Sequence, residues 1–181
     1  MALSIFDIFK IGVGPSSSHT IGPMWAGRYF LDELIARNEF EKVARIKVGL
    51  YGSLALTGFG HATDKAAILG IAGLAPDTMC PDFADEVFNR AKSEGKLRLN
   101  DLRDIDFNYE SDMIFHFNEA LPEHPNGIRF YAVDDNGIGL FEKSYLSTGG
   151  GFVVSVDDFH QGSSAEDTEI DVPWDFDNGD D

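Results

Sequence analysis

Side chains that could bind or activate a substrate are concentrated in the stretch 12–23, which reads GVGPSSSHTIGP. Its glycines permit backbone angles that a Cβ would forbid, and Pro15 stiffens the loop. The polar residues that follow are Ser16, Ser17, Ser18, His19 and Thr20. They precede an apolar pattern with helical spacing, so the loop would present hydroxyls and backbone N–H groups to a carboxylate or phosphate at a helix N-terminus. One serine would be explained as a helix cap, but this run exceeds what a cap requires.

A second group of polar residues surrounds His61, in the segment Gly58–Lys65. An apolar helix is predicted over Ala66–Leu74, beginning at Thr63 or His61, and Asp64 in its first turn would suit the helix dipole. We therefore expect a second helix N-terminus that carries a histidine. Ser53 follows a predicted strand and would lie at its carboxyl edge, where α/β folds often bind ligands, although a turn serine that satisfies its own backbone explains it equally well.

Two further segments carry chemistry or special backbone geometry. The loop Leu121–Gly127 has turn composition, and His124 and Asn126 project from it. The run Gly149–Gly151 indicates either a sharp turn or a backbone that cradles a ligand, and composition leaves both readings open.

Four of these segments together resemble the iron–sulfur-dependent L-serine dehydratases, also called L-serine ammonia-lyases, of the type with both domains on one polypeptide. They are Gly14–Thr20 with Phe6–Lys10 before it, Gly60–Asp64, His124–Gly127 and Gly149–Phe152, in the same order as in the family. The similarity extends from about Ser4 to about Phe176, and it covers only the family's N-terminal or β domain. Ala62 is a departure, because the family often has glycine there.

The resemblance implies that the chain deaminates L-serine to pyruvate and ammonia together with a cluster-bearing α domain, a step of amino-acid catabolism that feeds gluconeogenesis. It implies that His61 is the general base, with His19 and His124 as alternative bases, and that Asp64 orients His61 or the substrate ammonium. The expected substrate-binding residues are Ser16, Ser17, Ser18, His19, Thr20, Ser53, Asp64, His124, Asn126, Gly149 and Gly150.

The family's 4Fe–4S cluster would polarise the substrate hydroxyl and bind the carboxylate. Such a cluster needs about three or four thiolates, and Cys80 is the single cysteine of this sequence. We therefore expect no metal ligands in this chain, a cluster-binding α domain that is absent from it, and an isolated fragment that is nearly inactive. Pyridoxal phosphate is not expected, because no lysine has the setting of a Schiff-base lysine.

Two other function classes compete with this interpretation. The family's β domain is similar to the allosteric substrate-binding domain of some phosphoglycerate dehydrogenases, so the chain could be a non-catalytic module that senses serine or another small anion. Such a module has no use for a histidine base, and the match at His61 and His124 favours the enzyme. A zinc hydrolase built on His19, His61 and His124 lacks any ligand spacing such as His-Glu-x-x-His.

Composition limits the partners of the protein. The 181 residues suit a single domain over residues 1–156, followed by an acidic linker over 157–181 that leads towards the α domain. A formal net charge of −17 argues against nucleic acid and anionic membranes as partners. No apolar run approaches the roughly 20 residues of a membrane span, and no leader pattern begins the chain, so we expect a cytoplasmic protein. The sequence leaves open whether the protein forms a homodimer and whether its substrate is serine or threonine.

The elements that must position these residues follow from periodicity. Apolar spacing predicts helices over Met24–Ala36 and Asp82–Glu94, and alternation predicts strands over Val43–Leu50, Asp112–Asn118 and Phe152–Val156. Ile128–Asp134 and Ile138–Leu146 flank Asp135-Asn136-Gly137, a strong hairpin signal. The order of elements predicts an α+β fold, a mixed β-sheet with helices packed on one side.

Overall fold

The computed structural model describes residues 14–161. The predictions for Phe6–Lys10 and for the acidic residues 162–181 lie outside these described residues. The helical elements are η1 (Ser17–Ile21, a π-helical turn), α2 (Gly22–Ala36), η2 (Phe40–Lys42), α3 (Ser53–His61), α4 (Thr63–Ile71), α5 (Pro81–Ser93), α6 (Tyr109–Asp112) and α7 (Val156–His160). The strands are β1 (Arg45–Tyr51), β2 (Lys96–Leu99), β3 (Arg103–Asp106), β4 (Met113–His116), β5 (Gly127–Val133), β6 (Gly139–Gly149) and β7 (Phe152–Ser155).

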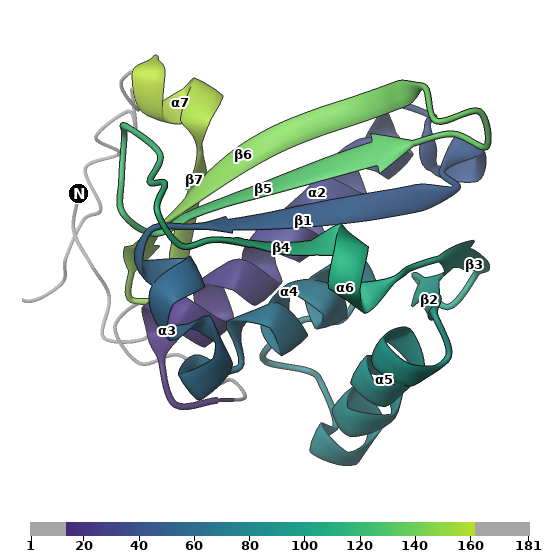
Figure 1. The fold of residues 1–181 in the computed structure, drawn as a ribbon, viewed down its shortest axis with the longest axis horizontal. Coiled ribbons are helices and arrows are strands. Elements are labelled where there is room, and N and C mark those ends of the chain that lie inside the picture. The colour runs from purple at the N-terminus through teal and green to yellow at the C-terminus, as the bar shows by residue number, and fades with distance from the viewer. Residues whose placement is uncertain (1–13, 162–181) are drawn as a thin grey trace, which may run out of the picture.

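The strands form one seven-stranded mixed sheet, in the order β2-β3-β1-β5-β6-β7, with β4 paired to β1. β1 is parallel to β3 and β4 and antiparallel to β5, while β5, β6 and β7 form an antiparallel meander. Figure 1 shows α3, α4 and α5 together on one side of the strands, and α7 apart from them beside the end of β7. The α+β prediction is confirmed, and the likeness to the allosteric domain of phosphoglycerate dehydrogenases stays a prediction.

The core lies between the sheet and α2, α3 and α4. Alternate residues of β1, Ile46, Val48 and Leu50, are fully buried, as period-2 alternation requires for a strand with one covered face. Phe30 of α2 stacks on Phe130 of β5, with ring centroids 5.2 Å apart. This packing fixes α2 across the sheet and thereby fixes η1, which continues directly into α2.

α2 and α4 approach each other through two glycines. A Cβ at Gly27 would lie 2.8 Å from the carbonyl oxygen of Ala67, and a Cβ at Gly70 would clash with the carbonyl oxygen of Met24. The two backbones can be this close only because both positions lack a side chain. The starts of α2 and α4, where the polar segments of interest lie, are therefore held at a short, fixed spacing.

Most elements predicted from periodicity are confirmed with small shifts at their ends. The hairpin is β5–β6, and its turn is closed by backbone N–H groups of Asn136 and Ile138 that donate to the Asp134 carboxylate. The predicted charged helix is α5, and the strand expected over Val43–Leu50 is β1. The first residues of the acidic stretch, Asp157–His160, belong to α7, where Asp157 pairs with Lys143 of β6.

Two features of the local structure were not predicted. Of the two starts expected for the helix after Gly60, Thr63 is the one at which α4 begins, and His61 is instead the last residue of the unexpected helix α3. The segment after Ala75, expected to lack regular structure apart from one helix, contains the β2–β3 hairpin. In both cases tertiary packing decides, because Leu54, Leu97 and Ile105 are buried in the core although their neighbours favour turns.

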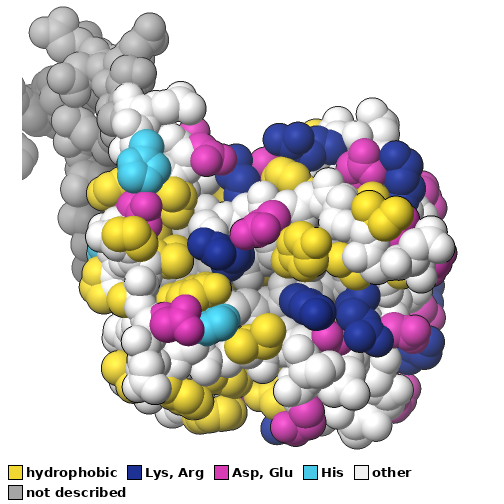
Figure 2. Space-filling view, turned by 45° about the horizontal axis from the view of Figure 1, so that its top comes forward, with side chains coloured by type: hydrophobic (Ala, Val, Ile, Leu, Met, Phe, Trp, Pro, Cys, Tyr) yellow, Lys and Arg dark blue, Asp and Glu magenta, His cyan; other side chains and the backbone are white. Residues whose placement is uncertain are grey.

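On the face of the molecule drawn in Figure 2, charged side chains of both signs are interspersed. No helix among residues 14–161 has the length and apolar character needed to cross a membrane.

Candidate functional site

His19 is held between two serine hydroxyls. Its Nδ1 lies 2.9 Å from the Oγ of Ser18, and its Nε2 lies 2.8 Å from the Oγ of Ser53 at the start of α3. Ser16 caps the π-helical turn, because its Oγ accepts the N–H of His19 and its carbonyl accepts those of Thr20 and Ile21. Ser16 therefore takes up backbone N–H groups that were expected to bind an anion. The groups left to face a ligand are the serine hydroxyls and the His19 ring.

His61 lies beside His19 at the carboxyl end of α3, with ring centroids 5.1 Å apart. Its Nδ1 is 3.1 Å from the carbonyl oxygen of Thr57. A carbonyl only accepts, so Nδ1–H is the donor and the neutral ring carries its lone pair on Nε2. His61 is partly exposed, so a basic nitrogen is available at the surface next to the His19 ring.

Two threonines join the histidine segments. Thr20, which follows His19, donates its hydroxyl to the carbonyl oxygen of His61 at 2.8 Å. Thr63, two residues after His61, donates its hydroxyl to the carbonyl oxygen of His19 at 2.6 Å. Both threonines are buried. The reciprocal bonds fix η1 against the junction of α3 and α4, and neither partner carbonyl was predicted from the sequence.

The junction between α3 and α4 depends on Ala62, whose φ of 53° lies in the left-handed region. A non-glycine residue pays a penalty there. The left-handed backbone at Ala62 ends α3 at His61 and allows α4 to begin at the next residue, Thr63, whose side chain is buried. The alanine that departs from the family's usual glycine therefore occupies the position where glycine would be easiest to accommodate.

The loop that contains His124 and Asn126 joins the same network. The Pro125 carbonyl accepts the N–H of Ser53 at 2.8 Å, and Asn126 donates its side-chain amide to the carbonyl of Ser147 at 3.2 Å. Ser147 in turn donates its hydroxyl to the Ser18 carbonyl at 2.7 Å. Three of the segments singled out by sequence, those of His19, His61 and His124, are therefore joined in one network with Ser147 of β6, which the sequence did not indicate.

His124 has the opposite tautomer to His61. The backbone N–H of Asn126 donates to its Nδ1 at 3.0 Å, so in the neutral ring Nε2 carries the proton. In this geometry His124 is a hydrogen-bond donor towards a ligand. This arrangement favours His61 over His124 as a base.

Asp64 and the glycine run lie differently from their expected roles. The Asp64 carboxylate is buried and accepts the hydroxyl of Tyr109, while the ring nitrogen of His61 is oriented by Thr57. Burial, and then the hydrogen bond to Asp64, raises the pKa of Tyr109 far above its ordinary value, so Tyr109 stays a donor. Gly149 and Gly150 have φ of 102° and 60° and turn the chain between β6 and β7. The sharp turn is confirmed, and the ligand cradle stays a prediction.

Electrostatics distinguish the two paired rings. Burial, and then the neighbouring His61, lowers the pKa of His19 below its ordinary value of 6.5. His19 is therefore neutral at pH 7 and binds through hydrogen bonds rather than through charge.

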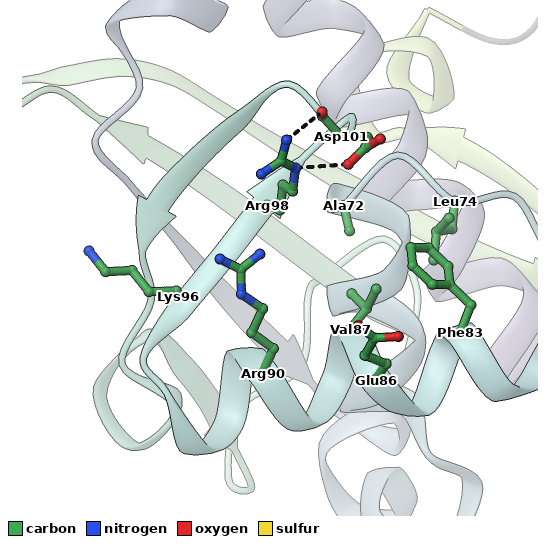
Figure 3. A pocket seen from close by; sticks show the side chains of 9 residues that line it. All are labelled: Ala72, Leu74, Phe83, Glu86, Val87, Arg90, Lys96, Arg98 and Asp101. Carbon is green, nitrogen blue, oxygen red and sulfur yellow. Dashed lines mark hydrogen bonds and ion pairs between the residues drawn. The ribbon is translucent and has the colours of Figure 1, made fainter.

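Two cavities lie away from the histidine rings. The first, of about 270 Å³, lies between α5 and β2 (Figure 3), and none of its lining residues is a predicted site residue. Its arginines are already paired, Arg90 with Asp104 and Arg98 with Asp101. The second, of about 220 Å³, borders the segments that carry His19 and His61, and its lining includes Thr20, Ala62 and Lys65. Neither His19 nor His61 is among the residues that line it.

Residues 14–161 contain no group of three or more His, Cys, Asp or Glu side chains placed to hold a metal ion. His19, His61 and His124 therefore do not form the zinc site considered above. Cys80 is exposed and precedes α5.

Comparison with known proteins places these features in context. Residues 4–158 match the family model described as serine dehydratase beta chain. The chain is 42% identical to L-serine dehydratase of Haemophilus influenzae over 180 residues, 46% identical to that of Streptomyces coelicolor over 157, and 44% identical to L-serine dehydratase 2 of Escherichia coli over 175. These matches cover 99%, 87% and 96% of this chain but only 39%, 34% and 37% of the respective relatives.

Proposed function

Because the chain belongs to the serine dehydratase beta chain family, we propose that it forms part of an enzyme that deaminates L-serine to pyruvate and ammonia. The remaining part would be polypeptide of the kind that the relatives carry beyond the segment matched here. The observation that carries the proposal is the histidine pair, with the His61 lone pair on Nε2 beside a neutral, hydroxyl-bound His19.

The reaction begins with removal of the Cα proton of serine, which is weakly acidic. His61 accepts this proton at Nε2, since its Nδ1–H is committed to the Thr57 carbonyl. The β-hydroxyl then leaves as water with the proton that His61 holds, which restores the neutral imidazole. The product, 2-aminoacrylate, tautomerises to the imine, and a second water hydrolyses it to pyruvate and ammonia. A positioned base typically contributes about 100- to 10,000-fold to such a step.

The substrate carboxylate is assigned to the hydroxyl-rich turn. Ser16, Ser17 and Ser18 offer hydroxyls there, and His19, being neutral, would contribute a hydrogen bond rather than a charge. The Nε2–H of His124 and the hydroxyl of Ser53 are the donors proposed for the substrate's other polar groups. Gly149 and Gly150 would lie beside the substrate, and Asp64, which accepts the hydroxyl of Tyr109, would orient His61 or the substrate ammonium.

An iron–sulfur cluster does not fit the residues of this chain. A cluster requires about three or four thiolates, and the sequence has one cysteine, Cys80, which is exposed. We therefore propose that the cluster's ligands belong to the additional polypeptide, and we assign it no step here.

A sensing module remains the second candidate, because the hydroxyl-rich turn would bind a small anion whether or not a base stood beside it. The two functions differ in what His61 does. A sensor should bind L-serine and lose little when His61 is changed, whereas the enzyme should lose turnover.

The test uses a complete enzyme in which this chain replaces the segment that it matches in L-serine dehydratase 2 of Escherichia coli. Prepared anaerobically, it should form pyruvate from L-serine, and His61→Ala should lower kcat by at least about 100-fold. His160→Ala, on exposed α7, is the matched control and should retain activity. Full turnover by the His61→Ala enzyme would overturn the assignment of the base.

A further inference from the structure

An aromatic patch is formed by two elements, α3 and the end of β4. Leu56 and Phe59 of α3 are each 65% exposed, and Phe117, just after β4, is 50% exposed. Phe115 of β4 lies between the two phenylalanines, with ring centroids 4.4 Å from Phe59 and 5.8 Å from Phe117, both stacked. We call these four residues the α3–β4 patch. Figure 2 shows hydrophobic side chains gathered on the side where Figure 1 places α3.

The patch is uncharged within a strongly acidic protein. The segments 53–63 and 113–118 contain no Asp, Glu, Lys or Arg, although the chain has 31 acidic residues and a net charge of −17. An exposed stack of apolar rings is unfavourable in water, and contiguous patches of this kind mark interaction sites. A partner could approach this area without the repulsion that the rest of the surface would exert on an acidic polypeptide.

β4 adds an unpaired strand edge. Among the described strands, β4 pairs only with β1. Free edges are usually covered in the native assembly, since their N–H and C=O groups would otherwise recruit other chains. The open edge and the aromatic stack come from the same strand, so one partner would cover both.

The position of the patch indicates which partner this is. Leu56 and Phe59 lie on the same short helix as Ser53, which binds His19, and His61, so a polypeptide resting on the patch would contact the helix that carries the site. The chain spans only 34–39% of the relatives that it matches, so these proteins contain a large further part.

We propose that the α3–β4 patch is the docking surface for the polypeptide that completes the enzyme. This inference rests on the proposed function for the identity of the partner. A second copy of this chain is the competing occupant.

Hydrogen–deuterium exchange on the isolated chain and on the complete enzyme described above tests the docking. Peptides of α3 and β4 should exchange at least tenfold more slowly in the complete enzyme, while peptides of α5 should not change. Phe59→Ser with Phe117→Ser should remove this protection and lower kcat/KM at least tenfold. Leu102→Ser, which removes a 71% exposed apolar side chain between β2 and β3, is the matched control and should change neither.

The outcomes separate the two proposals. Protection of α3 and β4 without pyruvate formation would support the docking surface and overturn the proposed function. Pyruvate formation with α3 and β4 as exposed as in the isolated chain would overturn the docking surface alone. Concentration-dependent protection in the isolated chain, with a dimer in sedimentation, would overturn it in favour of a second copy.

Discussion

At the scale of residues, the site depends on two histidines with different tasks. The Thr57 carbonyl selects the tautomer of His61, and two serine hydroxyls hold the ring of His19. Burial and the neighbouring imidazole keep His19 uncharged at neutral pH. The pair therefore combines one proton acceptor with one hydrogen-bonding group, rather than two competing bases.

The lowered pKa of His19 can be measured directly. Titration of its imidazole C–H resonances by NMR should give a value below 6.5, and His61→Gln should raise it only part of the way back, because burial is the larger cause. His19→Gln identifies the resonance. A His19 resonance that titrates above 6.5 would contradict this account.

The same shift affects stability. Since protonation is easier in the unfolded chain, His19 contributes stability that is present above pH 6.5 and is lost as the pH falls from 6.5 through the lower folded pKa. Urea denaturation of the protein should show this loss, and His19→Gln should reduce it.

At the scale of elements, the contact between α2 and α4 positions both histidine segments. Gly70→Ala should lower the free energy of unfolding by about 1–3 kcal/mol, because the new methyl group meets the backbone of α2 at Met24. Gly60→Ala is the matched control: it is also helical, but nothing lies within 4 Å of the added Cβ. It should be neutral or stabilising by up to about 1 kcal/mol. Urea denaturation followed by circular dichroism measures both, and equal effects would contradict the proposed crowding.

The sequence could predict elements whose periodicity and turn chemistry agree. The β5–β6 hairpin was predictable because Asn136-Gly137 sits between alternating strands. α3 was not, because Thr57, Gly58 and Gly60 disfavour a helix that exists through the burial of Leu54 and Ala55. Nothing local indicates that Ala62 adopts a left-handed conformation, so the sequence left Thr63 and His61 open as the start of α4.

In the candidate site, too, some features could be predicted from the sequence and others could not. The motif residues His19, His61 and Ser53 were predictable, and the structure brings them together. Their partners were not, since the Thr57 carbonyl and the Ser147 hydroxyl are brought in by the path of the backbone. Asp64 was expected near His61, but the rotation set by α4 directs it to Tyr109.

At the scale of the whole molecule, acidic charge exceeds what the ion pairs can neutralise. The chain has 31 acidic and 14 basic residues, and exposed pairs contribute only about 0–1 kcal/mol each. Raising NaCl from about 10 to 150 mM shortens the Debye length from about 30 to 8 Å and should relieve the self-repulsion. Calorimetry should show Tm rising by about 2–4 °C, equivalent to about 1 kcal/mol. Sucrose at equal osmolarity controls for non-ionic effects. A Tm that falls as NaCl is added would contradict the claim that repulsion between acidic side chains destabilises the protein.

The crossed threonine bonds have a consequence for how the site opens. Thr20 holds the main chain at His61, and Thr63 holds it at His19, so a separation of η1 from the α3–α4 junction breaks both buried bonds in one event. Local opening is then cooperative, and the two imidazoles gain or lose their working geometry as a unit. The contacts that place His19, its bond to Ser53 and the two threonine bonds, are then lost together.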